Sequence, residues 1–149
     1  MTVETDTSLR VSRLIQADAE TVFRAWTEPG ALRQWSCPEG SDVEDVQVDL
    51  RVGGKYRIRM KGPEGEVHTA VGTYRTIEPA KKLVYTWDWE ENDHKVGESQ
   101  VTVEFHQRGE ATEVVLTHER FPNGEATKLH ELGWTSCLNR LESRYAKRS

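Results

Sequence analysis

Hydrophobic and polar residues alternate with two different periods along this chain, and the changes of period divide it into three parts. The first part reads as a strand over residues 9–15, a short helix over 19–26, and a further turn or two carrying Leu32 and Trp35 on one side. From Asp42 the period is that of strands, and from Gly124 it is that of a helix. The chain is therefore predicted to begin with a strand and two short helices, continue as a sheet and end in one long helix.

The middle part contains the clearest strand pattern of the chain. Four large side chains alternate with other residues there and should share one face: Leu83, Tyr85, Trp87 and Trp89. Further strands are predicted at residues 42–48, 55–61, 67–77, 101–106 and 114–118. Most of these strands are joined by short turns, so the seven strands should form a mainly antiparallel sheet.

The last part predicts one amphipathic helix that stays helical to the end of the chain. Its apolar positions recur every fourth residue, with Trp134 beside them, at Leu129, Gly133, Cys137, Leu141 and Tyr145. A helix of roughly 22 residues is about 33 Å long, close to the length of a ten-residue strand. The predicted class is α+β, with a curved antiparallel sheet wrapped around this helix.

Length and composition narrow the class of protein. A chain of 149 residues matches one domain, here residues 1–149, with residues 1–8 as a flexible N-terminal tail. No signal peptide and no apolar run of about 20 residues is visible, so we expect a cytoplasmic protein without a membrane span. Cys37 and Cys137 are far apart in sequence and are expected to stay reduced. A monomer or a weak homodimer is expected.

The net charge of −5 gives no long-range attraction to nucleic acid or to anionic lipid. One basic stripe runs along a predicted strand: Lys55, Arg57, Arg59 and Lys61. A phosphate-binding face is one interpretation, but it lacks interleaved aromatic residues. We favour a solvated face whose cations pair with acids on neighbouring strands, for which Asp88, Glu90 and Glu104 are available.

No metal or cofactor is expected. The five histidines show neither His-x-His nor His-x-x-x-His spacing, and no acid cluster of the ligand type lies beside them. Gly53-Gly54 lacks the lysine and the helix that follow a phosphate-binding loop. Cys137 could act as a nucleophile, but on the apolar stripe of a helix a cysteine usually behaves as a small hydrophobe.

Four segments resemble one family closely and occur in the order found there: residues 11–26, Asp49-Leu50-Arg51-Val52-Gly53-Gly54, Leu116-Thr117-His118-Glu119 and His130-Glu131-Leu132-Gly133-Trp134. The family comprises bacterial proteins similar to the C-terminal domain of the activator of heat-shock protein 90 ATPase. It belongs to the START-like (SRPBCC) superfamily with the helix-grip fold. The resemblance extends from about Leu9 to Tyr145.

This resemblance implies a cavity between sheet and helix that takes lipids, polyketides or other apolar molecules, with a stress-related role. It also implies co-chaperone activity, as in the larger relatives that carry an additional N-terminal domain. This chain shows no segment for that domain, which argues against co-chaperone activity. It also has Trp35-Ser36 where many bacterial members have two tryptophans, a change that would reshape one rim of the cavity.

The candidate ligand-binding residues are those expected to face the space between sheet and helix. They are Trp35, Tyr56, Ile58, Met60, Trp87, Trp89, Phe105, Leu116, His118, Trp134, Cys137 and Leu141. The alternative for most of them is that they simply fill the core. His118 could orient a ligand hydroxyl or act as a general base, but we favour a core histidine bonded to a backbone carbonyl or to Tyr56.

Three classes of function remain. The first is binding of a small, mostly apolar molecule, such as a lipid or a polyketide-like compound, with His118 or Tyr56 fixing one polar end. The second is a cyclase-type or hydrolase-type enzyme in the same cavity, which would need at least two converging polar groups; no catalytic residue is assigned. The third is a protein-interaction module with a chaperone partner, which would need an exposed apolar patch, whereas the predicted apolar faces are taken by the core.

Overall fold

The computed structural model describes residues 7–91 and 97–146. The described part contains ten elements, in chain order β1 (Ser8–Ile15), α1 (Ala19–Thr27), α2 (Pro29–Trp35), β2 (Asp42–Val48), β3 (Lys55–Lys61), β4 (Val67–Glu78), β5 (Lys82–Trp89), β6 (Ser99–Arg108), β7 (Ala111–Glu119) and α3 (Gly124–Arg144). The α+β class and the seven strands predicted from the periodicity are confirmed. The predicted tail over residues 1–8 is outside the described residues except at its end, where Ser8 already belongs to β1.

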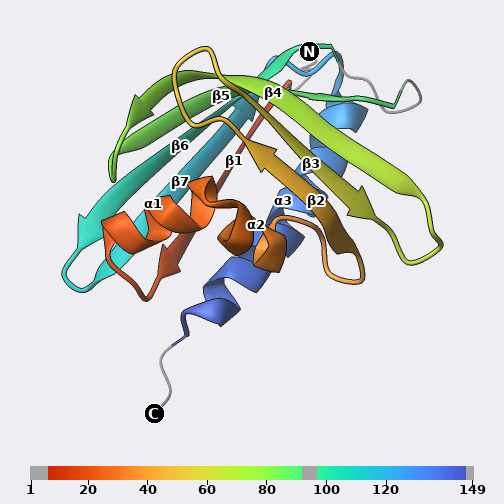
Figure 1. The fold of residues 1–149 in the computed structure, drawn as a ribbon. Helices are drawn as coiled ribbons and strands as arrows, with labels where there is room; N and C mark the ends of the chain where they lie inside the picture. The colour runs from red at the N-terminus through yellow and green to blue at the C-terminus, as the bar shows by residue number, and fades with distance from the viewer. Residues whose placement is uncertain (1–6, 92–96, 147–149) are drawn as a thin grey trace, which may run out of the picture.

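All seven strands form one antiparallel sheet in the order β1-β7-β6-β5-β4-β3-β2. The sheet curves over α3, and α1 and α2 lie at its open side (Figure 1). The long helix packs against β1 and α2, and α2 packs against β2. The concave face of the sheet, the two short helices and α3 therefore enclose one interior.

Side chains at the helix ends fix where α1 and α3 begin. Asp18 accepts a hydrogen bond from the Thr21 backbone N–H at 2.8 Å, and Asn123 accepts one from that of Ala126 at 2.8 Å. The last helix ends at Arg144, so it does not continue to the end of the chain as predicted. Residues 147–149 are outside the described residues, as are residues 92–96, where we expected a mobile loop.

Strand parity was predicted correctly for the large apolar side chains. Trp87 is 6% exposed, Phe105 4% and Leu141 0%, and all three belong to one core cluster. The helical stripe was predicted less well, because Leu129, its first member, is 63% exposed. The stripe is buried only from Trp134 onward, where α3 lies under the sheet.

One aromatic ring crosses a strand. Tyr56 on β3 is paired with Gly72 on β4, and its hydroxyl reaches past β4 to donate to the Thr86 carbonyl on β5 at 2.6 Å. A Cβ added to Gly72 would meet the Thr86 carbonyl oxygen and would lie 2.7 Å from the Tyr56 ring. The Tyr56 side chain can therefore cross β4 only because residue 72 is a glycine.

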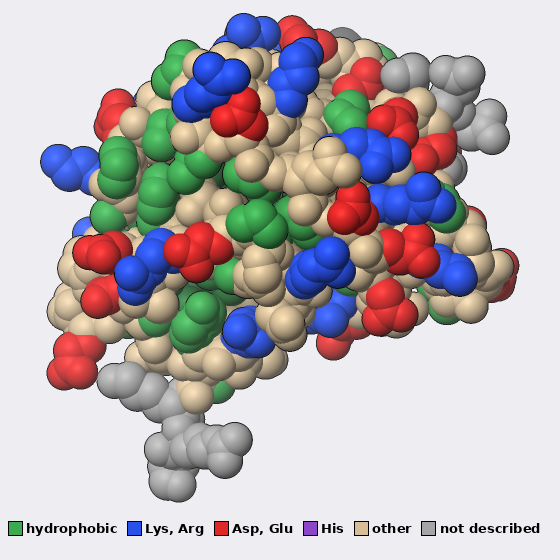
Figure 2. All heavy atoms as spheres, in the orientation of Figure 1, with side chains coloured by type: hydrophobic (Ala, Val, Ile, Leu, Met, Phe, Trp, Pro, Cys, Tyr) green, Lys and Arg blue, Asp and Glu red, His purple; other side chains and the backbone are tan. Residues whose placement is uncertain are grey.

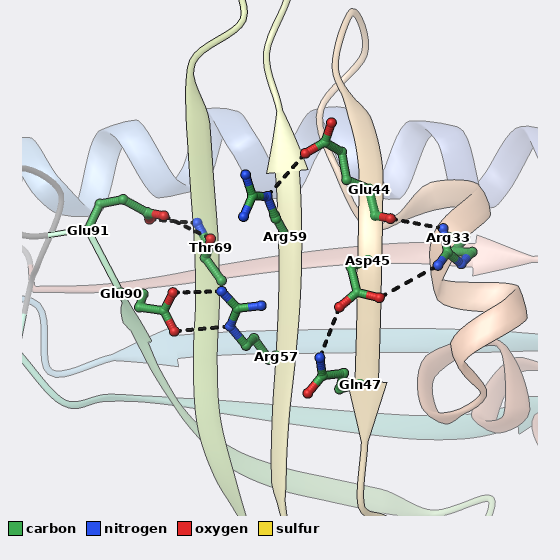
Figure 3. A network of polar contacts seen from close by, with 9 residues as sticks. All are labelled: Arg33, Glu44, Asp45, Gln47, Arg57, Arg59, Thr69, Glu90 and Glu91. Atoms are coloured by element: carbon green, nitrogen blue, oxygen red, sulfur yellow. Dashed lines mark hydrogen bonds and ion pairs between the residues drawn. The ribbon is translucent and has the colours of Figure 1, made fainter.

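The outer face of β2, β3 and β4 is covered by paired charges, which confirms the pairing expected for two cations of the basic stripe. Arg57 forms two hydrogen bonds to Glu90, at 2.8 and 3.0 Å, and Arg59 bonds Glu44 at 3.1 Å (Figure 3). Glu44 was not among the predicted acids. Figure 2 shows side chains of both signs interleaved over these strands. This face presents ion pairs to solvent and no concentrated positive field.

No helix in the described part of the chain is both long and apolar enough to span a membrane.

Candidate ligand pocket

The interior between sheet and helices contains a pocket of about 510 Å³. Its walls come from α1, α2, the loop after α2, β3, β4, β5 and the first half of α3. The lining includes every tryptophan of the chain and three tyrosines: Trp26, Trp35, Trp87, Trp89, Trp134, Tyr56, Tyr74 and Tyr85. An aromatic surface of this kind suits a guest with a large apolar body.

The structure brings two thirds of the predicted ligand-binding residues to this pocket. Those that line it are Trp35, Tyr56, Ile58, Met60, Trp87, Trp89, Trp134 and Cys137. The other four lie in the packed core and not in the pocket wall: Phe105, Leu116, His118 and Leu141. Phe105, Leu116 and His118 are on β6 and β7, which lie further along the sheet, toward β1. Leu141 is in the last turn of α3.

His118 is fully buried, and each of its ring nitrogens has a protein partner. Trp134 Nε1 donates to His118 Nδ1 at 3.0 Å, so Nδ1 carries no proton. His118 Nε2 lies 2.8 Å from Ser99 Oγ, and Ser99 donates to the Trp87 carbonyl at 2.6 Å. The donors therefore run in one direction, from indole to imidazole to hydroxyl to carbonyl, and tie α3 to β7, β6 and β5.

Burial lowers the pKa of His118 well below its ordinary value, and the nearby His130 lowers it further. The neutral ring is the form that this hydrogen-bond chain requires. The preference for a core histidine over a catalytic base agrees with the geometry, although the partners are Ser99 and Trp134 instead of a carbonyl or Tyr56. Tyr56 likewise donates its O–H to the Thr86 carbonyl. Neither residue has a donor left for the polar end of a ligand.

A second indole–imidazole pair stands in the wall of the pocket. Trp89 Nε1 donates to His130 Nε2 at 2.9 Å, and His130 Nδ1 lies 2.8 Å from the Ala126 carbonyl one turn earlier. Burial lowers the pKa of His130, which favours the neutral ring that accepts from Trp89. These contacts hold the first half of α3 against the end of β5.

Gly133 leaves open space on the pocket side of α3. It lines the pocket together with Leu129 and Cys137, which are one turn away in either direction. A Cβ built on Gly133 would meet no atom within 4 Å. The face of α3 therefore has a gap at Gly133, and this gap opens into the pocket.

The charges around the pocket are unevenly distributed. Among the described residues that line it there are two carboxylates, Glu66 and Glu125, and neither lysine nor arginine. Both glutamates are exposed, as is Leu129, so they mark where the pocket opens to solvent. Arg140 is outside the lining and donates to the carbonyl oxygens of Cys37, Pro38 and Ser41, of which Pro38 and Ser41 line the pocket. A bound anion would have no positive partner in the described lining.

Cys137 has the properties of a small hydrophobe. Burial raises the pKa of its thiol, and a nearby Cys37 raises it further, so the nucleophilic thiolate is disfavoured. Burial also raises the pKa of Cys37, whose Sγ is contacted by Arg140 at 3.1 Å. Both cysteines are free thiols in the structure.

Several pocket residues were missed in the sequence. Tyr85 shares the predicted face with Trp87, so strand parity could have included it. His130 lies one helical turn before Trp134, and that spacing could have placed it beside the pocket. Trp26 and Tyr74 carried no comparable signal, because their roles depend on how α1 and β4 meet β5 in space.

Comparison with known proteins identifies relatives of this chain in sequence and in fold. The sequence model of the family described as "Activator of Hsp90 ATPase homolog 1-like protein" matches residues 16–146. None of the curated proteins compared with the chain matches it.

Solved structures match over nearly the whole chain. The AHSA1 protein from Silicibacter pomeroyi is 28% identical, with 93% of this chain and 97% of that chain covered and a TM-score of 0.84. A protein from Chromobacterium violaceum is 25% identical, with 95% and 99% covered and a TM-score of 0.87. A protein from Mycobacterium smegmatis is 17% identical, with 100% and 99% covered and a TM-score of 0.80, which shows a shared fold alone.

Proposed function

This chain belongs to the family of Activator of Hsp90 ATPase homolog 1-like proteins, and we propose that it binds a small, mostly apolar molecule in the pocket between the sheet and α3. The observation that carries the proposal is the aromatic pocket of about 510 Å³, which opens at Glu66, Glu125 and Leu129. Protein interiors are ordinarily packed without voids of this size. A pocket of this size lined by aromatic side chains is typical of a ligand-binding site.

The state of the two candidate catalytic residues favours binding over catalysis. His118, the residue considered as a general base, has both ring nitrogens occupied by Trp134 and Ser99. The thiol of Cys137 is held protonated by burial. A reaction would need a nucleophile and a base that meet at one point of the pocket, and these two candidates are unsuited to either role.

The expected affinity is modest. Burying about 300 Å² of apolar ligand surface contributes roughly 7 to 8 kcal/mol at ~25 cal/mol per Å². Immobilising the ligand costs at least about 4 kcal/mol of that. The remainder corresponds to dissociation constants from roughly millimolar to high micromolar, and good polar contacts would tighten it.

Substitutions at Gly133 test the proposal, because that residue faces the pocket and has no steric neighbour. We expect Gly133→Ala to raise the free energy of unfolding by about 0.5 to 1 kcal/mol, since glycine is unfavourable inside a helix. We expect Gly133→Phe to fill the pocket and to weaken binding of the uncharged probe N-phenyl-1-naphthylamine by on the order of tenfold or more. Probe fluorescence measures binding, and thermal melting confirms that each variant is folded.

The matched control is Leu132→Phe, which adds a ring to the adjacent residue on the exposed side of α3. It should leave probe binding within about twofold of the parent protein, because surface substitutions away from a site have small effects. Equal binding by the Gly133→Phe variant and the parent would refute a ligand site in this pocket.

Regulation of an Hsp90 ATPase is a second candidate, suggested by the family's description. The observation that favours it is an apolar pair on α3, Leu129 and Leu132, which are 63% and 65% exposed. Their exposure corrects our expectation that the core takes all apolar faces.

We nevertheless expect no stimulation by this chain alone. Two leucines supply only a small part of the roughly 1,200 Å² that a stable protein interface buries. A steady-state ATPase assay with the Hsp90 of the same organism measures this directly. A several-fold rise in ATP turnover, lost in a Leu129→Ser/Leu132→Ser variant, would establish the regulatory function instead.

A further inference from the structure

Three tyrosines stand together on adjacent strands at one end of the pocket. Tyr56 lies on β3, Tyr74 on β4 and Tyr85 on β5, and all three rings are at least nine-tenths buried. Their ring centroids are 5.2 to 6.1 Å apart. Trp26 on α1 covers this end and donates its indole N–H to the Tyr85 hydroxyl at 3.2 Å.

The three hydroxyl groups differ in what they can still do. Tyr56 donates its proton to the Thr86 carbonyl, so its donor is used. Tyr85 accepts from Trp26, but its own O–H has no acceptor among the described residues. Tyr74 has no hydrogen-bond partner among those residues either, and its hydroxyl oxygen is not fully buried. Two tyrosine O–H donors on adjacent strands, with ring centroids 6.1 Å apart, therefore line the pocket without an acceptor among the described residues.

The surroundings of these two hydroxyl groups favour a neutral ligand over an anionic one. Burial raises the pKa of both tyrosines, and the charge of Asp49 raises that of Tyr74 as well, so both remain neutral donors. No lysine or arginine lines the described pocket. A carboxylate placed here would lose its hydration without gaining a countercharge, whereas a neutral carbonyl oxygen loses far less.

We propose that the hydroxyl groups of Tyr74 and Tyr85 form a polar subsite that donates hydrogen bonds to a carbonyl oxygen of an uncharged aromatic ligand. The inference rests on the proposed function and adds the chemical class of the guest. Trp26 assists, because a hydroxyl that accepts a hydrogen bond becomes a better donor. The tryptophan-lined remainder of the pocket holds the aromatic body.

A series of three probes with one carbon skeleton tests this inference: indane, 1-indanone and indane-1-carboxylate. Their dissociation constants are measured by titrating the indole N–H signals of the uniformly ¹⁵N-labelled protein, which suits weak binding. In the parent protein we expect indane and 1-indanone to bind and the carboxylate to bind about tenfold more weakly than 1-indanone. The Trp26 indole signal should shift on adding 1-indanone, since its acceptor is Tyr85.

The Tyr74→Phe and Tyr85→Phe variants remove one hydroxyl each. We expect each to weaken 1-indanone binding about fivefold while changing indane binding less than about twofold. Tyr74→Phe is the cleaner variant, because Tyr85→Phe also deprives Trp26 of its acceptor and should lower thermal stability. The matched control is Tyr145→Phe at the end of α3, outside the pocket. It should leave the dissociation constants of indane and 1-indanone unchanged.

The outcomes separate the two proposals. If both tyrosine variants weaken indane and 1-indanone equally, or if the carboxylate binds as tightly as the ketone, the polar subsite is refuted while ligand binding in the pocket stands. If no probe shifts any indole signal of the parent protein, both the subsite and the proposed binding function fail.

Discussion

Gly72→Ala should lower the free energy of unfolding by about 3 kcal/mol. The added methyl group would meet the Thr86 carbonyl oxygen of the neighbouring strand and the ring of Tyr56. The Thr86 carbonyl belongs to the backbone of β5, where Thr86 is paired with Gln100 of β6, so it cannot move aside without disturbing the sheet. The variant must therefore shift β4 away from β5 at this point and displace the Tyr56 ring, which breaks the hydrogen bond of Tyr56 to Thr86. Urea denaturation followed by far-UV circular dichroism measures the change.

Gly30→Ala is the matched control for this substitution. Gly30 lies in the first turn of α2, and a Cβ there would meet no atom within 4 Å. Its replacement should leave stability unchanged or raise it by up to about 1 kcal/mol. If Gly72→Ala and Gly30→Ala were equally stable, the crossing of β4 by the Tyr56 ring would be disproved.

Acid should destabilise the protein through His118. The pKa of this residue is well below its ordinary value in the folded chain and returns to about 6.5 on unfolding. Below pH 6.5 the unfolded state therefore binds a proton that the folded state does not, and stability falls by ~1.4 kcal/mol per pH unit until the folded pKa is reached. Between pH 7 and pH 5 the expected loss is about 2 kcal/mol. His130 acts in the same direction, because burial lowers its pKa too.

The His118→Gln variant isolates the contribution of His118 from that of the carboxylates. An amide oxygen can accept from Trp134 but does not titrate. The variant should be less stable at pH 7, yet its loss between pH 7 and pH 5 should be smaller by about 2 kcal/mol. Equal losses in parent and variant, measured by urea denaturation at both pH values, would contradict a neutral buried His118.

The sequence was sufficient to predict the fold because period alone fixes which face of a strand is buried. The alternation around Trp87 placed that residue and Trp89 toward the interior, and the spacing around Leu141 placed the last helix beneath them. Leu129 was misplaced for a physical reason. Helical spacing indicates a face but not how far along the helix that face is covered, and the pocket opens where Leu129 lies.

The site was predictable only in part. Pocket residues on β3 and β5 were found by parity, but the polar ends of the pocket depend on contacts between distant segments. The Trp26–Tyr85 bond joins residues 59 positions apart, so it could not be predicted before α1 was placed against β5. His118 was correctly favoured as a core residue, but its partners could not be named before the strands were paired.

The gathering of every tryptophan at one pocket has an optical consequence. Trp26 and Trp35 have ring centroids 4.5 Å apart, and Trp87 lies 5.3 Å from Trp89 and 5.2 Å from Trp134. At such separations excited indoles exchange energy, so the tryptophan emission arises from two coupled groups that line the pocket. A ligand that quenches one indole therefore also lowers the emission of the indoles coupled to it. Occupancy of the pocket can be followed in the unmodified protein by tryptophan fluorescence.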